Sequence, residues 1–258
     1  LAAVVFSPAD VGIIDAGPSA RRRYLDVLLS LNHEGYLESL QTYKHILAQR
    51  NAALRSSADM MVVRAWDDSL ARSASEIMIA RADWVTERSG DFCKYYEMIS
   101  GKISASMLYV SKVSIKDWNQ EQVYSKCLQA LEESWSRDAF RKNTSQGPHL
   151  DELLLTLQGD QTLGEISEIG SGGQRRTAAL ALRLIEGDTI RRSRGVQPIL
   201  LLDDAFAELD DGRRERVLLL MDQDRFGQVI MTAPKESDVQ IHGEKLYQWG
   251  IREGTIYA

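Results

Sequence analysis

The chain has 258 residues, of which 44% are hydrophobic, so it can bury a substantial core. Its formal net charge of −6 excludes a globally basic surface for nucleic acid, and any DNA contact must use a local patch. No apolar run approaches the ~20 residues that span a bilayer, so we expect no membrane-spanning helix and no membrane partner. Cys93 and Cys127 have neither disulfide nor zinc-ligand spacing, which is typical of a reducing compartment and predicts a cytoplasmic location.

The chain opens directly into an apolar run at residues 2–6, which predicts a buried strand. A start inside a core strand leads us to expect a further segment upstream of Leu1. Turn signals follow, and Pro18 with Ser19 suits the first turn of a helix. The arginine triplet at residues 21–23 is interpreted as a solvated helix face, with phosphate binding as the alternative.

The next stretch predicts helices. Apolar side chains recur at steps of four and three from Tyr36, Arg50 interrupts this spacing, and a second apolar run covers residues 70–84. With a break near residues 56–59, the pattern predicts an antiparallel helical hairpin. Residues 104–113 have strand character and residues 120–141 predict another helix. We expect the tryptophans at positions 66, 84, 118 and 135 to be packing residues.

The second half contains both predicted strands and predicted helices, and we assign it to the α/β class. Strands are predicted at residues 150–157, 199–202 and 228–231, and helices at 174–185 and 212–221. A turn is expected at Gly159-Asp160, a basic loop at 191–194, and a terminal hairpin from 246–249 through a turn near Glu253-Gly254 to 255–257. His149 has no metal-ligand pattern around it, so we assign it a structural role.

Two carboxylates follow the apolar run at residues 199–202, which predicts a strand buried on both faces. Asp203 and Asp204 therefore lie at the carboxyl edge of a sheet, where α/β proteins bind ligands. Since successive strand residues point to opposite faces, we expect one carboxylate to bind a metal and the other to activate water. The alternative is a solvated Asp-Asp turn.

A glycine-rich stretch precedes the predicted helix at 174–185. Gly170, Gly172 and Gly173 permit close backbone approach, and the helix N-terminus offers free N–H groups, so the two together predict an anion site, above all for phosphate. The alternative is a linker before a core helix. Arg175 and Arg176 are interpreted as surface charges, with DNA or nucleotide contact as the alternative. Thr232, at a strand end, either senses a phosphate or simply ends the strand.

These pieces carry a resemblance to ABC-type ATPases. Ser171-Gly172-Gly173-Gln174 is similar to their signature motif, residues 199–204 to the Walker B strand, residues 208–210 to the D-loop, and Thr232 to the switch residue. More specifically, the chain resembles the RecF family of bacterial recombination mediators along nearly its whole length. The other matching pieces are Phe6-Ser7-Pro8, Gly17-Pro18-Ser19, Arg21-Arg22, Leu25-Asp26, Gln49-Arg50-Asn51-Ala52 and Gly147-Pro148-His149.

The resemblance implies the C-terminal lobe of an ABC-type ATPase head with an inserted, mostly helical arm. We expect residues 1–18 to end the N-terminal lobe, residues 19–141 to form the arm, and residues 142–258 to form the C-terminal lobe. The family is a slow, DNA-dependent ATPase that dimerises on ATP, clamps DNA at single-strand gaps and assists RecA loading with RecO and RecR. It serves DNA replication, repair, recombination and the SOS response.

Residue roles follow from the same resemblance. Asp203 is expected to hold Mg²⁺ and Asp204 to polarise the attacking water. Ser171, Gly172, Gly173 and Gln174 are expected to reach the γ-phosphate of ATP held by the other protomer, with Asp210 contacting that protomer and Thr232 acting as the switch.

The sequence departs from the family pattern in two places. It contains no G-x-x-x-x-G-K-[ST] loop, which lies N-terminal to this region in the family, so we expect these 258 residues not to hydrolyse ATP alone. Ala207 stands where the family tends to have Ser. An Asp at position 204, where many ABC-type ATPases carry Glu, agrees with the RecF pattern.

Two other functions are left open by the sequence. One is a different SMC-like ATPase, for instance one fused to a nuclease, although such a protein carries an acidic cluster after the head. The other is a non-enzymatic module whose helical arm binds a partner protein.

Overall fold

The computed structural model describes residues 2–158, 163–206, 209–221, 227–234, 247–252 and 254–257. Several predicted features lie outside these residues: the Gly159-Asp160 turn, Ala207, Glu208, Leu246 and Glu253. Within the described part of the chain, no helix is both long and apolar enough to cross a membrane.

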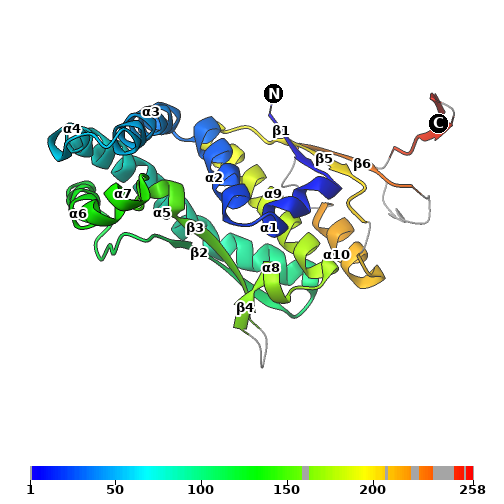
Figure 1. Cartoon of the computed structure of the whole chain (residues 1–258). Helices are drawn as coiled ribbons and strands as arrows, with labels where there is room; N and C mark the ends of the chain where they lie inside the picture. The colour runs from blue at the N-terminus through cyan, green and yellow to red at the C-terminus, as the bar shows by residue number, and fades with distance from the viewer. Residues whose placement is uncertain are drawn as a thin grey trace.

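A parallel sheet joins the start of the chain to its last third. Its strands, in spatial order, are β1 (Ala3–Phe6), β5 (Ile199–Asp203) and β6 (Gln228–Thr232). Both pairings are parallel, so the carboxyl ends of the strands meet at one edge (Figure 1). The predicted strands at 2–6, 199–202 and 228–231 are therefore confirmed as one sheet.

The sheet is buried on one face. Leu200 and Leu202 on β5 are buried, whereas Leu201 between them is half-exposed. Val5 and Ile230, the neighbours of Leu201 across the sheet, are 49% and 44% exposed. The prediction that this strand is buried on both faces is wrong for the described part of the chain. The helices described there cover only the face that carries Leu200 and Leu202.

A long buried helix supports that face. Helix α9 (Gly172–Arg194) packs against β1 on one side and against α5 (Asp67–Ser100) on the other (Figure 1). The predicted basic loop at residues 191–194 is wrong, because its arginines form the last turn of α9 and Gly195, at φ 65°, ends the helix. Cations are favourable at that position because they face the negative end of the helix dipole.

The predicted helical hairpin is confirmed. Helix α2 (Pro18–Asn32) leads into α3 (Tyr36–Arg55), the short α4 (Met60–Arg64) makes the return, and α5 packs along α3. Pro18 occupies the first helical position of α2, as expected.

The interpretation of the arginine triplet as a solvated face is wrong for its first member. Arg21 is 2% exposed, and its guanidinium is paired with Glu152 at 2.7 Å and Glu165 at 2.8 Å. Arg23 is exposed, as expected.

A second, antiparallel sheet lies beyond α5. It consists of β2 (Ser104–Val110), β3 (Glu152–Gln158) and β4 (Leu163–Glu165), and β2 packs on α5. The strands predicted at 104–113 and 150–157 are thus confirmed with shifted ends.

The predicted helix at 120–141 is two helices, α6 (Gln120–Glu133) and α7 (Trp135–Arg141). They divide at the buried Ser134, whose hydroxyl donates to Leu131 O at 3.2 Å and to Asp138 Oδ2 at 3.2 Å.

Short elements complete the described chain. They are the 3-10 helices η1 (Pro8–Val11) and η2 (Pro148–Leu150), helices α1 (Gly12–Asp15), α8 (Ile166–Ile169) and α10 (Asp211–Met221), and the hairpin of β7 (Gly250–Arg252) with β8 (Thr255–Tyr257). The terminal hairpin is confirmed, but its first strand begins at Gly250 rather than at 246, and Trp249 before it is 63% exposed.

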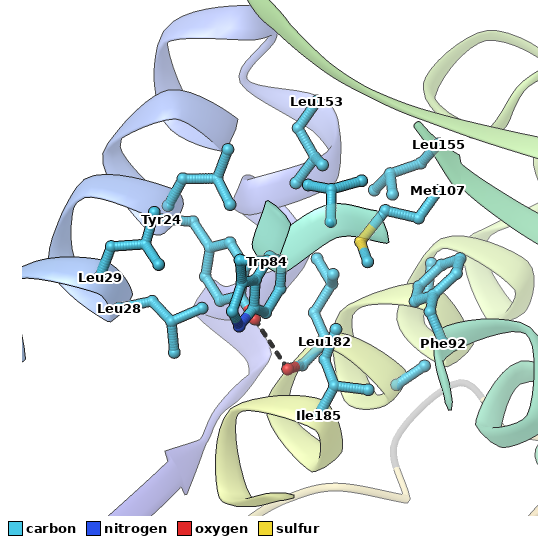
Figure 2. Close-up of a cluster of buried hydrophobic side chains, with 14 of the residues drawn as sticks. Tyr24, Leu28, Leu29, Trp84, Phe92, Met107, Leu153, Leu155, Leu182 and Ile185 are labelled. Carbon is cyan, nitrogen blue, oxygen red and sulfur yellow. Dashed lines mark hydrogen bonds between the residues drawn. The ribbon is translucent and has the colours of Figure 1, made fainter. Parts of the chain in front are cut away.

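The core is continuous through these layers. Figure 2 shows Tyr24 of α2, Trp84 of α5, Met107 of β2 and Leu182 of α9 packed together. Two buried polar groups in it are paired: the Tyr24 hydroxyl donates to Leu182 O at 2.8 Å, and Trp84 Nε1 donates to Thr189 Oγ1 at 3.1 Å. Trp84 is a packing residue, as predicted. The proposed division at residues 18 and 141 stays a prediction, and this core runs across it.

His149 has the structural role that we assigned to it. Its Nδ1 lies 2.5 Å from the Tyr43 hydroxyl and its Nε2 lies 3.1 Å from Thr144 O, so it joins α3 to the chain before β3. Gly147 makes room for this contact, since a Cβ there would lie 2.5 Å from the Tyr43 hydroxyl oxygen.

Mild acid is expected to destabilise the fold through His149. Burial, the largest cause, lowers the pKa of this imidazole below its ordinary value of ~6.5. Below that value the unfolded chain binds more protons than the folded one, so the free energy of unfolding falls as pH drops, by at most ~1.4 kcal/mol per pH unit. Urea unfolding at pH 7, 6 and 5 measures this slope. The slope should be smaller in His149→Asn, and equal slopes would contradict the assignment.

Candidate functional site

The carboxyl edge of the parallel sheet brings three predicted site residues together. Asp203 pairs with Thr232 across β5 and β6. The Thr232 hydroxyl donates to Asp203 Oδ1 at 2.6 Å and accepts from the Asp204 backbone N–H at 3.1 Å. One hydroxyl therefore fixes both the Asp203 carboxylate and the backbone of the next residue, and Asp203 itself is exposed at the edge.

Asp204 lies just beyond the end of β5 and has a left-handed backbone, with φ 47°. The alternation of side chains along a strand therefore does not apply to Asp204. The expectation that the two carboxylates lie on opposite faces of one strand is wrong, because only Asp203 belongs to the strand. A residue other than Gly adopts this conformation at a cost of ~1–2 kcal/mol, and Asp and Asn tolerate it best. The turn is held in place by its neighbours.

The glycine-rich stretch forms the start of α9. Ser171 is the N-cap residue: its hydroxyl accepts from Gln174 N at 3.3 Å, and Gln174 Oε1 accepts from Ser171 N at 2.7 Å. This reciprocal capping box stabilises the N-terminus of the helix, where Ser171 and Gly172 are exposed. The first N–H groups of a helix have no intrahelical acceptor and suit an anion.

Gly170 has a steric reason to be glycine. A Cβ there would lie 2.5 Å from Ile166 O, a backbone atom of α8 that cannot move aside. The turn from α8 into α9 is therefore closed to larger residues, which sets the position of Ser171.

The interpretation of Arg176 as a surface charge is wrong. Arg176 is 3% exposed and reaches from the first turns of α9 to the turn after β5. Its Nε donates to Ala205 O at 3.2 Å and its Nη2 donates to Asp204 O. Its guanidinium also lies over the Phe6 ring, 5.6 Å from the centroid. Arg175 remains partly exposed, as expected, and donates to Gly170 O at 2.9 Å.

Asp210 lies directly before α10, which begins at Asp211. One carboxylate oxygen accepts from Arg213 N at 2.8 Å and the other lies 2.5 Å from Arg213 Nη1. The Arg213 backbone hydrogen bond is the main cause that lowers the pKa of this carboxyl. The side chain is 57% exposed, so it caps α10 and still faces solvent.

Two of the three comparisons with known proteins found matches, and these two agree with each other. The scan against family models found no match. DNA replication and repair protein RecF of Streptococcus pyogenes serotype M5 (strain Manfredo) is 31% identical over 256 residues, which is 98% of this chain and 67% of that protein. Its counterpart in Streptococcus equi subsp. zooepidemicus (strain MGCS10565) is 32% identical over 256 residues, with the same coverage.

Solved structures agree. That of the recombination mediator protein RecF-ATPrS in the RecFOR pathway superposes with a TM-score of 0.81 at 28% identity, over 99% of this chain and 67% of that chain. The RecF-ATP structure gives 0.77 at 29% identity, over 89% of this chain and 62% of that chain.

The chain belongs to the RecF family. Its fold is accordingly that of an ABC-type ATPase head, α/β with a parallel sheet, and its family is one of DNA replication and repair proteins, of which the two solved structures above carry ATP or an ATP analogue.

The RecF-family residues of this site fit a nucleotide with magnesium. Mg²⁺ keeps several waters and takes one or two carboxylates, so it does not need a cage of protein ligands. In the described part of the chain, no group of three or more His, Cys, Asp or Glu side chains could hold a metal. Asp203, an exposed carboxylate oriented by Thr232, matches the sparse magnesium arrangement, and the capped, exposed start of α9 matches a phosphate.

Sequence reasoning missed two contributors to this RecF-family site. Arg176 lies one helical turn before the buried Leu180, so the 3.6-residue period already put it on the buried face of α9. Tyr96 of α5 donates to Gln174 O at 3.4 Å, and no local pattern in the sequence indicates this contact, because 78 residues separate the two.

Proposed function

We propose that this chain supplies the signature and Walker B halves of an ATP-dependent dimeric clamp that binds DNA at single-strand gaps. The clamp assists RecA loading together with RecO and RecR. One observation carries the proposal: the Thr232 hydroxyl joins Asp203 and the Asp204 backbone at the carboxyl edge of a parallel sheet. Such an edge is where α/β proteins bind nucleotides, and membership of the RecF family supports the DNA repair role.

In this proposal Asp203 holds Mg²⁺ through its water shell, and bound Mg²⁺ supplies charge neutralisation at the phosphates. Thr232 keeps the Asp203 carboxylate turned toward the edge of the sheet. Asp204 orients and accepts a proton from the attacking water. Its strained backbone supports an assignment to chemistry, since strained conformations cluster at functional sites.

The signature residues act on the second protomer. Ser171, with the N–H groups of Gly172 and Gly173, contacts the γ-phosphate bound to the partner, and Gln174 keeps the cap formed. The exposure of Ser171 at a fully formed helix start supports this role, because the contact must be made with another molecule. Asp210, also exposed, contacts the opposite protomer.

The full gene product is expected to be a monomer without nucleotide and a dimer with ATP and Mg²⁺. The full gene product is the sample for this experiment because the 258 residues contain no P-loop motif. Ser171→Arg is expected to abolish dimerisation, since a bulky cation at the helix start blocks the phosphate contact; losing the cap costs only ~1 kcal/mol of stability. Light scattering after gel filtration measures the mass, with and without gapped DNA.

Ser136→Arg, the same change at an exposed position on α7, is the matched control and is expected to dimerise normally. A dimer that forms equally well without nucleotide, or in Ser171→Arg, would overturn the proposed clamp. Capture of RecR by the nucleotide-free protein, with no ATP-dependent dimer, would instead identify a non-enzymatic partner-binding module.

A further inference from the structure

We infer that Arg176 is a positioning residue that mechanically couples the signature end of α9 to the Asp204 turn of the same protomer. The inference rests on the proposed function for its catalytic consequence. Its structural part concerns only contacts between α9 and the turn after β5, so it can be tested without nucleotide.

Two hydrogen bonds of Arg176 are directed at one short turn. Its Nε and Nη2 donate to the carbonyls of Ala205 and Asp204, two consecutive residues. A planar guanidinium holds two acceptors in a fixed geometry, which a lysine ammonium cannot reproduce. The Phe6 ring beneath the guanidinium restricts its plane further. The side chain therefore acts as a rigid clamp on the backbone of the turn.

The turn that Arg176 clamps needs external support. Asp204 has φ 47°, a conformation that relaxes unless its surroundings hold it. Thr232 holds the turn from β6 through the Asp204 N–H, and Arg176 holds it from α9 through the Asp204 carbonyl. The peptide groups on both sides of Asp204 are thus fixed by different elements, and together they aim its carboxylate.

Arg176 is also rigidly connected to the signature. It lies five residues after Ser171 in a continuous helix of 23 residues whose next turns, through Ile185, are almost entirely buried. A close-packed helix moves as a body, so a shift of its exposed start moves Arg176 with it. Contact of Ser171 with the partner's nucleotide would then be felt at Asp204, the residue assigned to water activation at the protomer's own nucleotide.

Amide hydrogen exchange of the 258-residue chain tests the clamp directly. The Asp204 N–H, bonded to Thr232, is the reporter, and the Leu180 N–H inside α9 is the internal reference. Arg176→Lys is expected to speed exchange at Asp204 by about tenfold or more, with Leu180 changed by less than about twofold. Arg175→Lys is the matched control, because its guanidinium contacts Gly170 and Asp15 instead, and should leave Asp204 unchanged.

A second measurement on the full gene product tests the catalytic consequence. Arg176→Lys is expected to lower kcat for ATP by about tenfold or more, with the affinity for ATP and the ATP-dependent dimer retained. If Arg176→Lys does not fold by circular dichroism, Arg176→Gln, which keeps an amide donor, is measured in its place.

The outcomes separate the two ideas. Two results overturn the inference. If the exchange rate at Asp204 is unchanged, Arg176 does not hold the turn. If the rates at Asp204 and Leu180 rise equally, Arg176 contributes only to general packing. If the wild-type protein turns over no ATP, the proposed function is overturned instead. The exchange rates still test whether Arg176 holds the Asp204 turn. Faster exchange at Asp204 with an unaltered kcat overturns the coupling.

Discussion

Asp204→Asn in the full gene product is expected to lower ATP turnover by roughly 100-fold or more while ATP binding and ATP-dependent dimerisation persist. General-base and water-positioning groups typically contribute factors of about 10²–10⁴. Asn is the substitution of choice here, because it tolerates the left-handed backbone of residue 204 and keeps the side-chain shape. The Thr232 hydroxyl accepts from the backbone N–H of residue 204 and Arg176 donates to its backbone carbonyl, so both hydrogen bonds can survive the change.

Single-turnover hydrolysis together with equilibrium binding of a fluorescent ATP analogue separates chemistry from binding. Asp203→Asn provides the contrast, since loss of a Mg²⁺ ligand should weaken magnesium-dependent nucleotide binding as well as turnover. Wild-type turnover in Asp204→Asn would show that this carboxylate is not the one that activates water. Weakened binding equal to that of Asp203→Asn would reassign Asp204 to the metal.

The sequence predicted the site better than it predicted the supports of the site. Asp203 and Thr232 could be placed at one edge because parallel strands align their carboxyl ends, and the start of α9 could be predicted at Gln174, two residues from its observed start at Gly172, because glycines precede an apolar helical stretch. These rules connect residues a few positions apart or repeat along a whole strand. They do not specify which side chain reaches across from another element.

Buried arginines are the clearest example of that gap. Arg21, Arg50 and Arg176 were interpreted as a solvated charge, a break in helical spacing and a surface charge, respectively, and all three are at most 3% exposed. Each is buried against a distant acceptor: Glu152 for Arg21, Asp138 for Arg50 and Ala205 for Arg176. A charge is buried only when partners offset its desolvation, and partners 29 to 131 residues away leave no local pattern.

Arg50 shows what such a residue does for the fold. Its Nε donates to Asp67 Oδ1 at 2.8 Å, and its Nη1 donates to Asp138 Oδ2 at 2.9 Å and Thr144 Oγ1 at 2.8 Å. The neighbouring Asn51 accepts from the backbone and side chain of Thr144. One turn of α3 thereby ties together the start of α5, helix α7 and the segment before η2, so the interruption of the heptad spacing is the point where the hairpin is fastened.

Arg50→Met is expected to lower the free energy of unfolding by about 3–5 kcal/mol, because it leaves Asp138, which is fully buried, and Asp67 without their shared cation. Urea unfolding followed by circular dichroism measures the change. Arg55→Met, at an exposed position in the last turn of the same helix, is the matched control and should stay within about 0.5 kcal/mol of wild type. Asp138→Asn in the Arg50→Met background should recover part of the loss, because a neutral amide in place of the carboxylate removes the unpaired buried charge. A loss below about 1 kcal/mol in Arg50→Met, or no recovery in the double variant, would mean that packing rather than this ion network fastens the hairpin.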